Sequence, residues 1–251
     1  MKTNQWIHIA NNYELERDAL SLPSLLTDEE IIHLVGEKKK MRILDYGSGS
    51  GTISRLLYKN QNELIAFEPI KPMRNLMIKL TPSEKYSKVS ILGNIEKIKK
   101  LKNIDCILCI NVLSHIKEVP SVFKMFNQIL NETGRLIVCL PHPLKNIGTW
   151  EKIKKNGIWE YVYYRLDGYM KEGKVKRTRE DFYGNVVVNE VVSNHRKIST
   201  YYNWLHDAGF DVVKILEPAP AIRLAKKYPI LYSKSSRIPY FLLFECIKAK
   251  K

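Results

Sequence analysis

The strongest constraint on the fold of this chain is a glycine-rich segment, Asp45-Tyr-Gly-Ser-Gly-Ser-Gly51, that joins an apolar stretch to an amphipathic one. Ile43 and Leu44 precede it with the character of a buried strand, and an apolar pattern at helical spacing begins at Thr52. Three glycines at alternate positions let the backbone bend tightly and let a ligand approach without a Cβ in the way. The helix that follows presents free N–H groups at its start. The segment therefore predicts a strand-turn-helix unit that binds a ligand.

The charge and spacing of this segment distinguish two kinds of nucleotide ligand. The fingerprint of nicotinamide dinucleotide enzymes is G-x-G-x-x-G, whereas here the glycines are Gly47, Gly49 and Gly51 and Thr52 follows. Asp45 at the strand end disfavours a pyrophosphate and favours a cationic ligand. S-adenosylmethionine combines a nucleoside with a cationic centre. At these residues the sequence resembles the class I S-adenosylmethionine-dependent methyltransferases.

Acidic and polar residues follow the next two expected strands. Glu68 lies 23 residues after Asp45, at the end of the strand 64–67, where a carboxylate can accept hydrogen bonds from both ribose hydroxyls. The strand 89–92 is followed by Asn94, at a position where the family usually has an acid that contacts the adenine amino group. Asn94 can accept that bond through its neutral amide oxygen, and the backbone N–H of Ile95 would face the ring.

The expected fourth strand, 105–110, runs into a segment that resembles the family's fourth motif. The resemblance places Asn111 near the methionine moiety. His115 would contact cofactor or substrate, or else cap the helix that follows. An N-terminal aromatic residue that folds over the cofactor is also implied, and Tyr13 fits either that role or an ordinary surface position. The expected cofactor-binding set is Tyr13, Asp45, Gly47, Ser48, Gly49, Glu68, Pro69, Asn94, Ile95, Asn111, Val112 and His115.

Strand and helix patterns alternate along residues 40–140, which predicts an α/β fold with a parallel sheet covered by helices on both faces. The resemblance implies a Rossmann-like, doubly wound, seven-stranded, mostly parallel sheet whose antiparallel last strand is inserted beside the fifth. A capping pattern at 27–30 predicts the start of an N-terminal helix. The expected organisation is a helical lid (1–40), an S-adenosylmethionine-binding core (41–141), a substrate cap insertion (142–197) and a C-terminal completion of the sheet (198–251).

Residues 142–197 interrupt this alternation with two β-rich stretches, 158–164 and 186–192, and predict a strand-rich cap. Methyl transfer to a hydroxyl or a carbon acid needs a positioned base, and His142 and His195 are the catalytic candidates, although each also fits a structural hydrogen bond. Aromatic and polar side chains of the cap are expected to contact the acceptor. The expected substrate-binding set is His142, Trp159, Tyr161, Tyr183, Glu190 and Arg196.

The chain carries a formal net charge of +15, from 41 Lys and Arg against 26 Asp and Glu. Because the lysines are spread along the chain, a solvated surface is favoured over a nucleic-acid stripe. The first hypothesis is therefore a methyltransferase that converts S-adenosylmethionine to S-adenosylhomocysteine and methylates N, O or C of a small-molecule metabolite. The alternatives are an RNA (tRNA or rRNA) methyltransferase that uses the basic surface and a non-catalytic S-adenosylmethionine-binding partner protein.

The four cysteines suggest core packing rather than metal or redox chemistry. Cys106 and Cys109 have C-x-x-C spacing, but residues three apart in a strand point to opposite faces. The dispersed His and acidic residues give no metal-ligand spacing, so no metal is expected. With no apolar run of about 20 residues and no signal-peptide pattern, we expect a cytoplasmic protein with reduced thiols.

Overall fold

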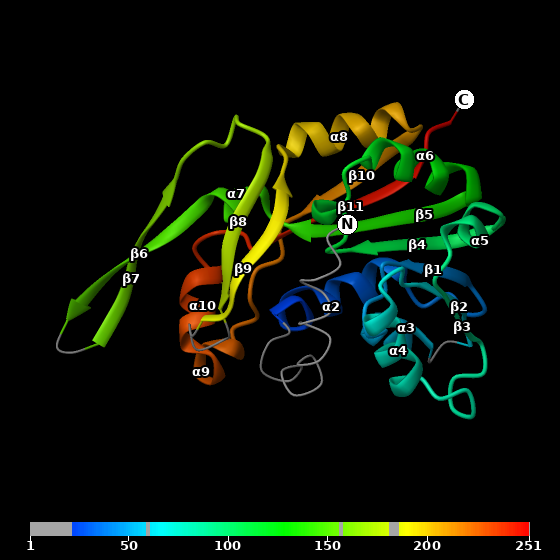
Figure 1. Cartoon of the computed structure of the whole chain (residues 1–251), viewed down its shortest axis with the longest axis horizontal. Coiled ribbons are helices and arrows are strands. Elements are labelled where there is room, and N and C mark those ends of the chain that lie inside the picture. Colours follow the sequence, from blue (N-terminus) through cyan, green and yellow to red (C-terminus); the bar gives the residue numbers. More distant parts are fainter. Residues whose placement is uncertain (1–21, 59–60, 156–157, 181–185, 251) are drawn as a thin grey trace.

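The computed structural model describes residues 22–58, 61–155, 158–180 and 186–250 (Figure 1). Seven strands form one sheet in the order β10-β11-β5-β4-β1-β2-β3. β11 is antiparallel to both of its neighbours, and the other neighbouring pairs are parallel. The predicted Rossmann-like sheet, with its antiparallel last strand beside the fifth, is confirmed. Its strands are β1 (Arg42–Tyr46), β2 (Glu63–Phe67), β3 (Val89–Leu92), β4 (Ile104–Ile110), β5 (Leu130–Pro141), β10 (Phe210–Leu216) and β11 (Phe241–Lys248).

The direction of strand addition reverses between β1 and β4. From β1 the chain proceeds outward to β2 and β3, and then returns to place β4 and β5 on the other side of β1. Ligands of such sheets bind beyond the carboxyl ends of the strands at this reversal. The fold therefore predicts a ligand site at the residues that follow β1, β2 and β4.

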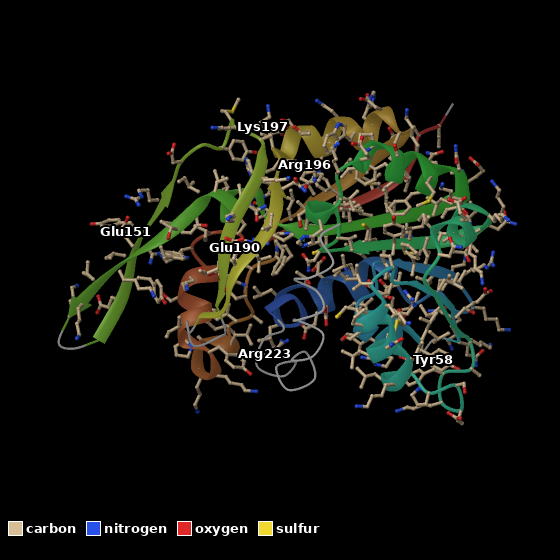
Figure 2. All side chains as sticks on the ribbon, viewed as in Figure 1. Tyr58, Glu151, Glu190, Arg196, Lys197 and Arg223 are labelled. Carbon is tan, nitrogen blue, oxygen red and sulfur yellow. The ribbon has the colours of Figure 1, made fainter. Side chains whose placement is uncertain are left out.

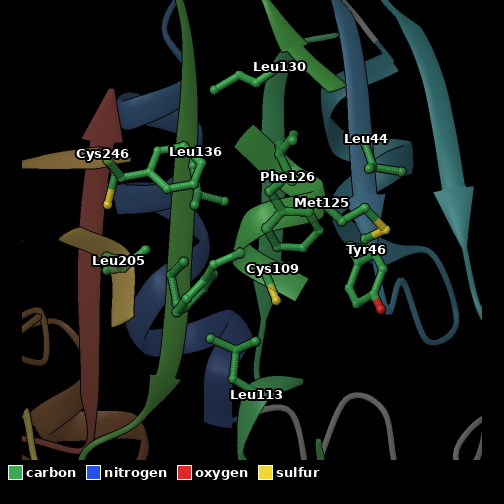
Figure 3. Close-up of a cluster of buried hydrophobic side chains, with 14 of the residues drawn as sticks. Leu44, Tyr46, Cys109, Leu113, Met125, Phe126, Leu130, Leu136, Leu205 and Cys246 are labelled. Carbon is green, nitrogen blue, oxygen red and sulfur yellow. The ribbon is translucent and has the colours of Figure 1, made fainter. Parts of the chain in front are cut away.

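The strand residues alternate between two apolar clusters, one on each face of the sheet. In β4, Cys106 and Leu108 belong to one cluster, whereas Ile107 and Cys109 belong to the other (Figure 3). All four cysteines are free and buried, as core packing requires. The helices of the Cys106 side are α2 (Leu22–Val35), α3 (Thr52–Leu57), α9 (Leu224–Lys227) and α10 (Pro229–Ser235). Those of the Cys109 side are α5 (Ile95–Lys99), α6 (Val119–Ile129) and α8 (Ile198–Asp207).

The start of the first described helix differs from the prediction. α2 already includes Leu22, so Thr27 lies inside the helix instead of capping its start. Thr27 is fully buried, and its hydroxyl contacts the thiol of Cys139 on β5. The capping pattern was misleading because the hydroxyl packs against the sheet.

The predicted strand-rich cap consists of two antiparallel hairpins. β6 (Gly148–Lys155) pairs with β7 (Ile158–Leu166), and β8 (Gly173–Glu180) pairs with β9 (Val186–His195). The helix α7 (Pro143–Ile147) connects β5 to the first hairpin. In Figure 1 the β6–β7 hairpin projects away from the sheet, and the β8–β9 hairpin lies between it and the ends of β4 and β5. The second hairpin is thus the cap element beside the strand ends.

Candidate active site

The glycine turn after β1 is fastened to the end of β2. The N–H groups of Gly47 and Ser48 both donate to the carbonyl of Phe67, at 2.7 and 3.0 Å. Gly47 has a φ of +78°, and a Cβ on it would lie 2.3 Å from Cγ2 of Val112, at the end of β4. Only glycine fits there, because both the left-handed backbone and the close approach exclude a side chain. The ends of β1, β2 and β4 therefore meet at this turn.

Glu68, directly after β2, connects the glycine turn to the next helix. Its Oε2 accepts a hydrogen bond from the N–H of Gly49 at 2.9 Å, and its Oε1 accepts one from the N–H of Ile70 at 2.8 Å. The residue is 6% exposed, and burial raises the pKa of its carboxyl while these two N–H groups oppose the rise. A carboxylate has about four acceptor positions, so two oxygens held in this way keep capacity for a ligand's hydroxyl groups.

Asp45 is a second buried acid at the same edge of the sheet. It is 3% exposed, and its Oδ2 accepts a hydrogen bond from the hydroxyl of Ser54 at 2.7 Å. The pKa of Asp45 is raised to about 6, chiefly by burial and also by the charge of Glu68, while the bond from Ser54 opposes the rise. Two acids in a region of low dielectric favour a cationic ligand between the ends of β1 and β2.

Asn111 directly follows β4 and has a left-handed conformation with φ of +58°. Its N–H donates to the carbonyl of Cys139 at 2.7 Å. Its Oδ1 is buried and accepts no hydrogen bond from any described residue. A non-glycine residue in this conformation and a buried acceptor without a donor are both features of ligand sites.

A 3₁₀ turn, η2 (Leu113–His115), follows Asn111. The N–H of His115 donates to the carbonyl of Val112 at 2.9 Å. The pKa of His115 is lowered to about 4, chiefly by burial and also by the charge of Arg177, while a hydrogen bond with the backbone of Val192 opposes both. The ring is therefore neutral at physiological pH, and it lies between the end of β4 and the cap strand β9.

At the end of β3, Asn94 caps α5. Its Oδ1 accepts a hydrogen bond from the N–H of Glu96 at 2.9 Å. An amide oxygen has two lone pairs, so Oδ1 of Asn94 keeps an acceptor position for a ligand. Ile95 is the first residue of α5 and is partly buried, and Pro69 after β2 is exposed. These residues lie beside the ends of β2 and β3, which pair in parallel register.

The two histidines predicted as bases are both buried and bonded within the fold. His142 is 1% exposed, its Nδ1 accepts a hydrogen bond from the N–H of Leu144, and its Nε2 lies 2.9 Å from Oε1 of Glu217. Burial lowers the pKa of His142, and Glu217 opposes this. His195 is fully buried, with Nε2 2.8 Å from the carbonyl of Tyr169. Its Nδ1 is buried and bonds to no described group.

The structure does not bring the predicted substrate residues together. Tyr161 lies on the β6–β7 hairpin, where its ring packs against Trp150 and beneath the ammonium of Lys234. Glu190 is exposed on β9 and pairs with Lys176 at 2.8 Å (Figure 2). Arg196 is buried at the junction of β9 and α8. Tyr13, Tyr183 and the side chain of Trp159 lie outside the described residues.

Three contributors to the site were not predicted from the sequence. Ser54 lies on the buried face of α3 beside Ile53, and a hydroxyl at an inward position of an amphipathic helix was the available signal. Arg74, in the helix α4 (Lys71–Leu80), donates to the carbonyl of Glu68 at 2.7 Å, and its guanidinium occupies the space a Cβ of Gly93 would need. Glu217 follows β10 as His142 follows β5, and these strands end at the same edge of the sheet.

Neither a metal centre nor a membrane helix occurs among the described residues. No group of three His, Cys, Asp or Glu side chains is arranged there to hold a metal ion. No helix in that part of the chain combines the length and the apolar character that crossing a bilayer requires.

Comparison with known families identifies the chain. A family model described as a methyltransferase domain matches residues 22–215. This is more than half of the 251 residues, and the chain belongs to that family. Together with the seven-stranded sheet, the match makes the protein a class I methyltransferase. A search of curated protein sequences found no match.

Solved structures with the same fold are distant in sequence. A protein of Listeria monocytogenes assigned as an S-adenosylmethionine-dependent methyltransferase superimposes with a TM-score of 0.71 at 19% identity, covering 88% of this chain and 96% of that one. An S-adenosylmethionine-dependent methyltransferase of Mesorhizobium loti gives 0.66 at 20% identity, covering 86% and 94%. The glycopeptide N-methyltransferase MtfA, complexed with S-adenosylmethionine, gives 0.60 at 12% identity, covering 88% and 92%.

Proposed function

We propose that the protein binds S-adenosylmethionine across the carboxyl ends of β1, β2 and β4 and transfers its methyl group to a small-molecule acceptor beneath the cap. The observation that carries the cofactor assignment is the bond from the Gly49 N–H to the Glu68 carboxylate. It joins the glycine turn to the acid expected at the ribose. Membership of a methyltransferase family favours an enzyme over a non-catalytic binding protein.

The site residues fit the three parts of this cofactor. Glu68 would accept the ribose hydroxyls, while Asp45 and the Oδ1 of Asn111 would accept from the ammonium of the methionine part. Among the described residues, a Cβ at Gly49 would meet only Cε of Met73, at 3.6 Å, which supports a ligand on the outer side of this glycine. The adenine would lie beside Pro69, Asn94 and Ile95. The remaining proposed contacts come from Tyr13, Gly47, Ser48, Val112 and His115.

The chemistry places modest demands on the protein. Bound S-adenosylmethionine would supply an electrophilic methyl group: a nucleophile of the acceptor would form a bond to the methyl carbon as the carbon–sulfur bond breaks, and S-adenosylhomocysteine would leave with the electron pair of that bond. The buried acids at the ends of β1 and β2 favour the cation, and the loop after β4 holds it against the cap. An amine acceptor in its neutral form needs no base, whereas a hydroxyl needs one.

His195 is the better candidate of the two bases. A neutral imidazole has one donor and one acceptor nitrogen. In His142 the acceptor is Nδ1, which is already occupied by the N–H of Leu144. In His195 the carbonyl of Tyr169 fixes the proton on Nε2, and Nδ1 keeps its lone pair. We therefore propose His195 as the base if the acceptor is a hydroxyl. His142 would instead stabilise the ends of β5 and β10 through its bonds to Leu144 and Glu217.

A small acceptor is proposed because the β8–β9 hairpin lies against the 3₁₀ turn after β4. Asn194 of β9 donates to the carbonyl of Ser114 at 2.9 Å, a contact that supports an acceptor site between the 142–197 insertion and the loop after β4. We propose that the acceptor is contacted by Tyr161, Trp159, Tyr183 and Glu190.

The alternative acceptor, RNA, is supported by the net charge of +15. The buried, free thiols agree with a cytoplasmic location.

A transfer assay with methyl-labelled S-adenosylmethionine distinguishes the acceptors. Low-molecular-mass metabolites and total RNA are offered in parallel over a series of salt concentrations, with Tyr161→Ala and Glu68→Ala as variants. We expect label in the metabolite fraction, little dependence on salt, and loss of transfer in Glu68→Ala. Saturable labelling of RNA that declines steeply with salt would establish the alternative, because each phosphate contact adds to the salt dependence.

A further inference from the structure

The loop after β4 is held by side chains of the cap in addition to two hydrogen bonds of its own backbone, from the N–H of His115 to the carbonyl of Val112 and from the N–H of Ile116 to that of Leu113. Arg196, 7% exposed, donates from Nη1 to the carbonyl of Leu113 at 2.9 Å, and from Nη2 to the carbonyls of Ile116 at 2.6 Å and Lys117 at 3.3 Å. A short 3₁₀ turn provides backbone donors for few of the carbonyls in and after it. One guanidinium supplies donors to three carbonyls here, and that of Leu113 also accepts the N–H of Ile116.

Asn194, near the end of β9, adds a fourth contact. Its Nδ2 donates to the carbonyl of Ser114 at 2.9 Å. Arg196 directly follows the last residue of β9, so Asn194 and Arg196 reach the loop from neighbouring positions of the cap. Together they bond to the carbonyls of four residues within 113–117.

Arg196 is fixed in this position by its other neighbours. Its guanidinium lies over the ring of Trp204, 5.2 Å from the centroid, and it forms a hydrogen bond with the hydroxyl of Tyr201. A planar guanidinium with these contacts has a fixed orientation, and its donors are directed at the protein. This arrangement suits a structural role better than contact with a substrate.

The loop that Arg196 holds leads directly from the cofactor site. It follows Asn111, whose buried Oδ1 is a proposed cofactor ligand, and Val112, whose side chain packs on the Gly47 turn. His115 lies within the loop and contacts the backbone of Val192 on β9. Any displacement of the loop therefore moves both the cofactor side and the cap side of the site.

We propose that Arg196, assisted by Asn194, is a positioning residue that fixes the 111–117 loop. Through this loop, contacts from the cap determine the geometry of the cofactor site. The cap thereby contributes to cofactor affinity without touching the cofactor. The inference rests on the proposed function for its ligand. The holding of the loop, however, can be measured without any ligand.

The test uses Arg196→Lys and Asn194→Ala in the full chain, with S-adenosylhomocysteine as the probe. The matched control is Arg237→Lys. Arg237 also donates to two backbone carbonyls, those of Tyr161 and Val162, and lies over the ring of Trp150, but it holds the β6–β7 hairpin. Lysine keeps the charge and loses the planar fork in both cases. Calorimetry measures the dissociation constant, and amide hydrogen exchange measures the opening of residues 111–117.

We expect faster exchange in the loop and weaker binding in both site variants, about tenfold or more for Arg196→Lys, since bonds to charged groups are the stronger ones. Arg237→Lys should match the wild type in both measurements. Unchanged exchange in the loop would overturn the inference, and so would a loosened loop with wild-type affinity. If Arg196→Lys does not fold, Asn194→Ala decides by the same criteria. If wild-type protein fails to bind the probe, the proposed function is wrong, and loop exchange alone still tests the holding role.

Discussion

Replacing Asp45 by Asn tests whether the ionised form of this buried acid lowers the free energy of unfolding. Burial raises the pKa of Asp45 from 3.8 to about 6 in the folded protein. An acid whose pKa is raised on folding binds more protons in the folded state than in the unfolded state. Its contribution therefore makes the folded protein less stable as pH rises through the window from about 4 to about 6.

The magnitude follows from the displacement of the pKa. A rise of roughly two pH units at about 1.4 kcal/mol each gives ~3 kcal/mol. The free energy of unfolding of wild type, relative to that of Asp45→Asn, should fall by about this amount between about pH 4 and about pH 8. The cost of burying the amide of Asn is the same at every pH, so it shifts the whole difference and leaves its pH dependence unchanged.

Urea denaturation of both proteins across this pH range measures the difference directly. Ser54→Ala serves as a control, because losing the hydroxyl bond should raise the pKa of Asp45 further and move the transition to higher pH. Binding of S-adenosylmethionine, a cation, should weaken below about pH 6 in the wild type, as Asp45 becomes protonated. If the free energies of unfolding of wild type and Asp45→Asn differ by the same amount at every pH in this range, the reasoning about Asp45 is refuted.

Three further substitutions test the glycine turn and the ribose acid. Gly47→Ala should destabilise the fold by about 2–4 kcal/mol, because its Cβ would lie 2.3 Å from Val112 Cγ2 at a φ of +78°. Adding Val112→Ala should restore part of the lost stability in thermal melts, and a double variant no more stable than Gly47→Ala would show that this contact is not the cause. Gly49→Ala should fold, with a strain cost of about 1 kcal/mol, yet lose the thermal shift given by S-adenosylhomocysteine; a wild-type shift would show that this glycine does not line the site. Glu68→Gln should weaken binding of the same ligand about tenfold or more in calorimetry, whereas an unchanged affinity would remove Glu68 from the ribose site.

Much of the fold was predictable because the signals are local. The glycine turn, and Glu68 after the second strand, depend on spacings within one strand-helix-strand unit, and the sheet built on them has the predicted antiparallel last strand beside the fifth. The opposite faces of Cys106 and Cys109 followed from strand geometry alone and are confirmed. The capping pattern at Thr27 failed because a hydroxyl can satisfy a distant group in place of the adjacent backbone.

The cap was harder to predict because its contacts join residues far apart in the chain. Arg196 reaches carbonyls about 80 residues away, and His142 reaches Glu217 across 75 residues. The sequence marked both as polar residues near a site, but their partners decide whether they face a ligand or the protein. Such partners are fixed by the way the hairpins pack, which no short pattern encodes.

The most direct test of the central claim is a calorimetric titration of the wild-type protein with S-adenosylhomocysteine and, separately, with NADH. The buried acids and the Gly49–Glu68 contact predict saturable binding of S-adenosylhomocysteine at one site per chain and no binding of NADH. Tight binding of NADH, with no heat from S-adenosylhomocysteine, would contradict the account.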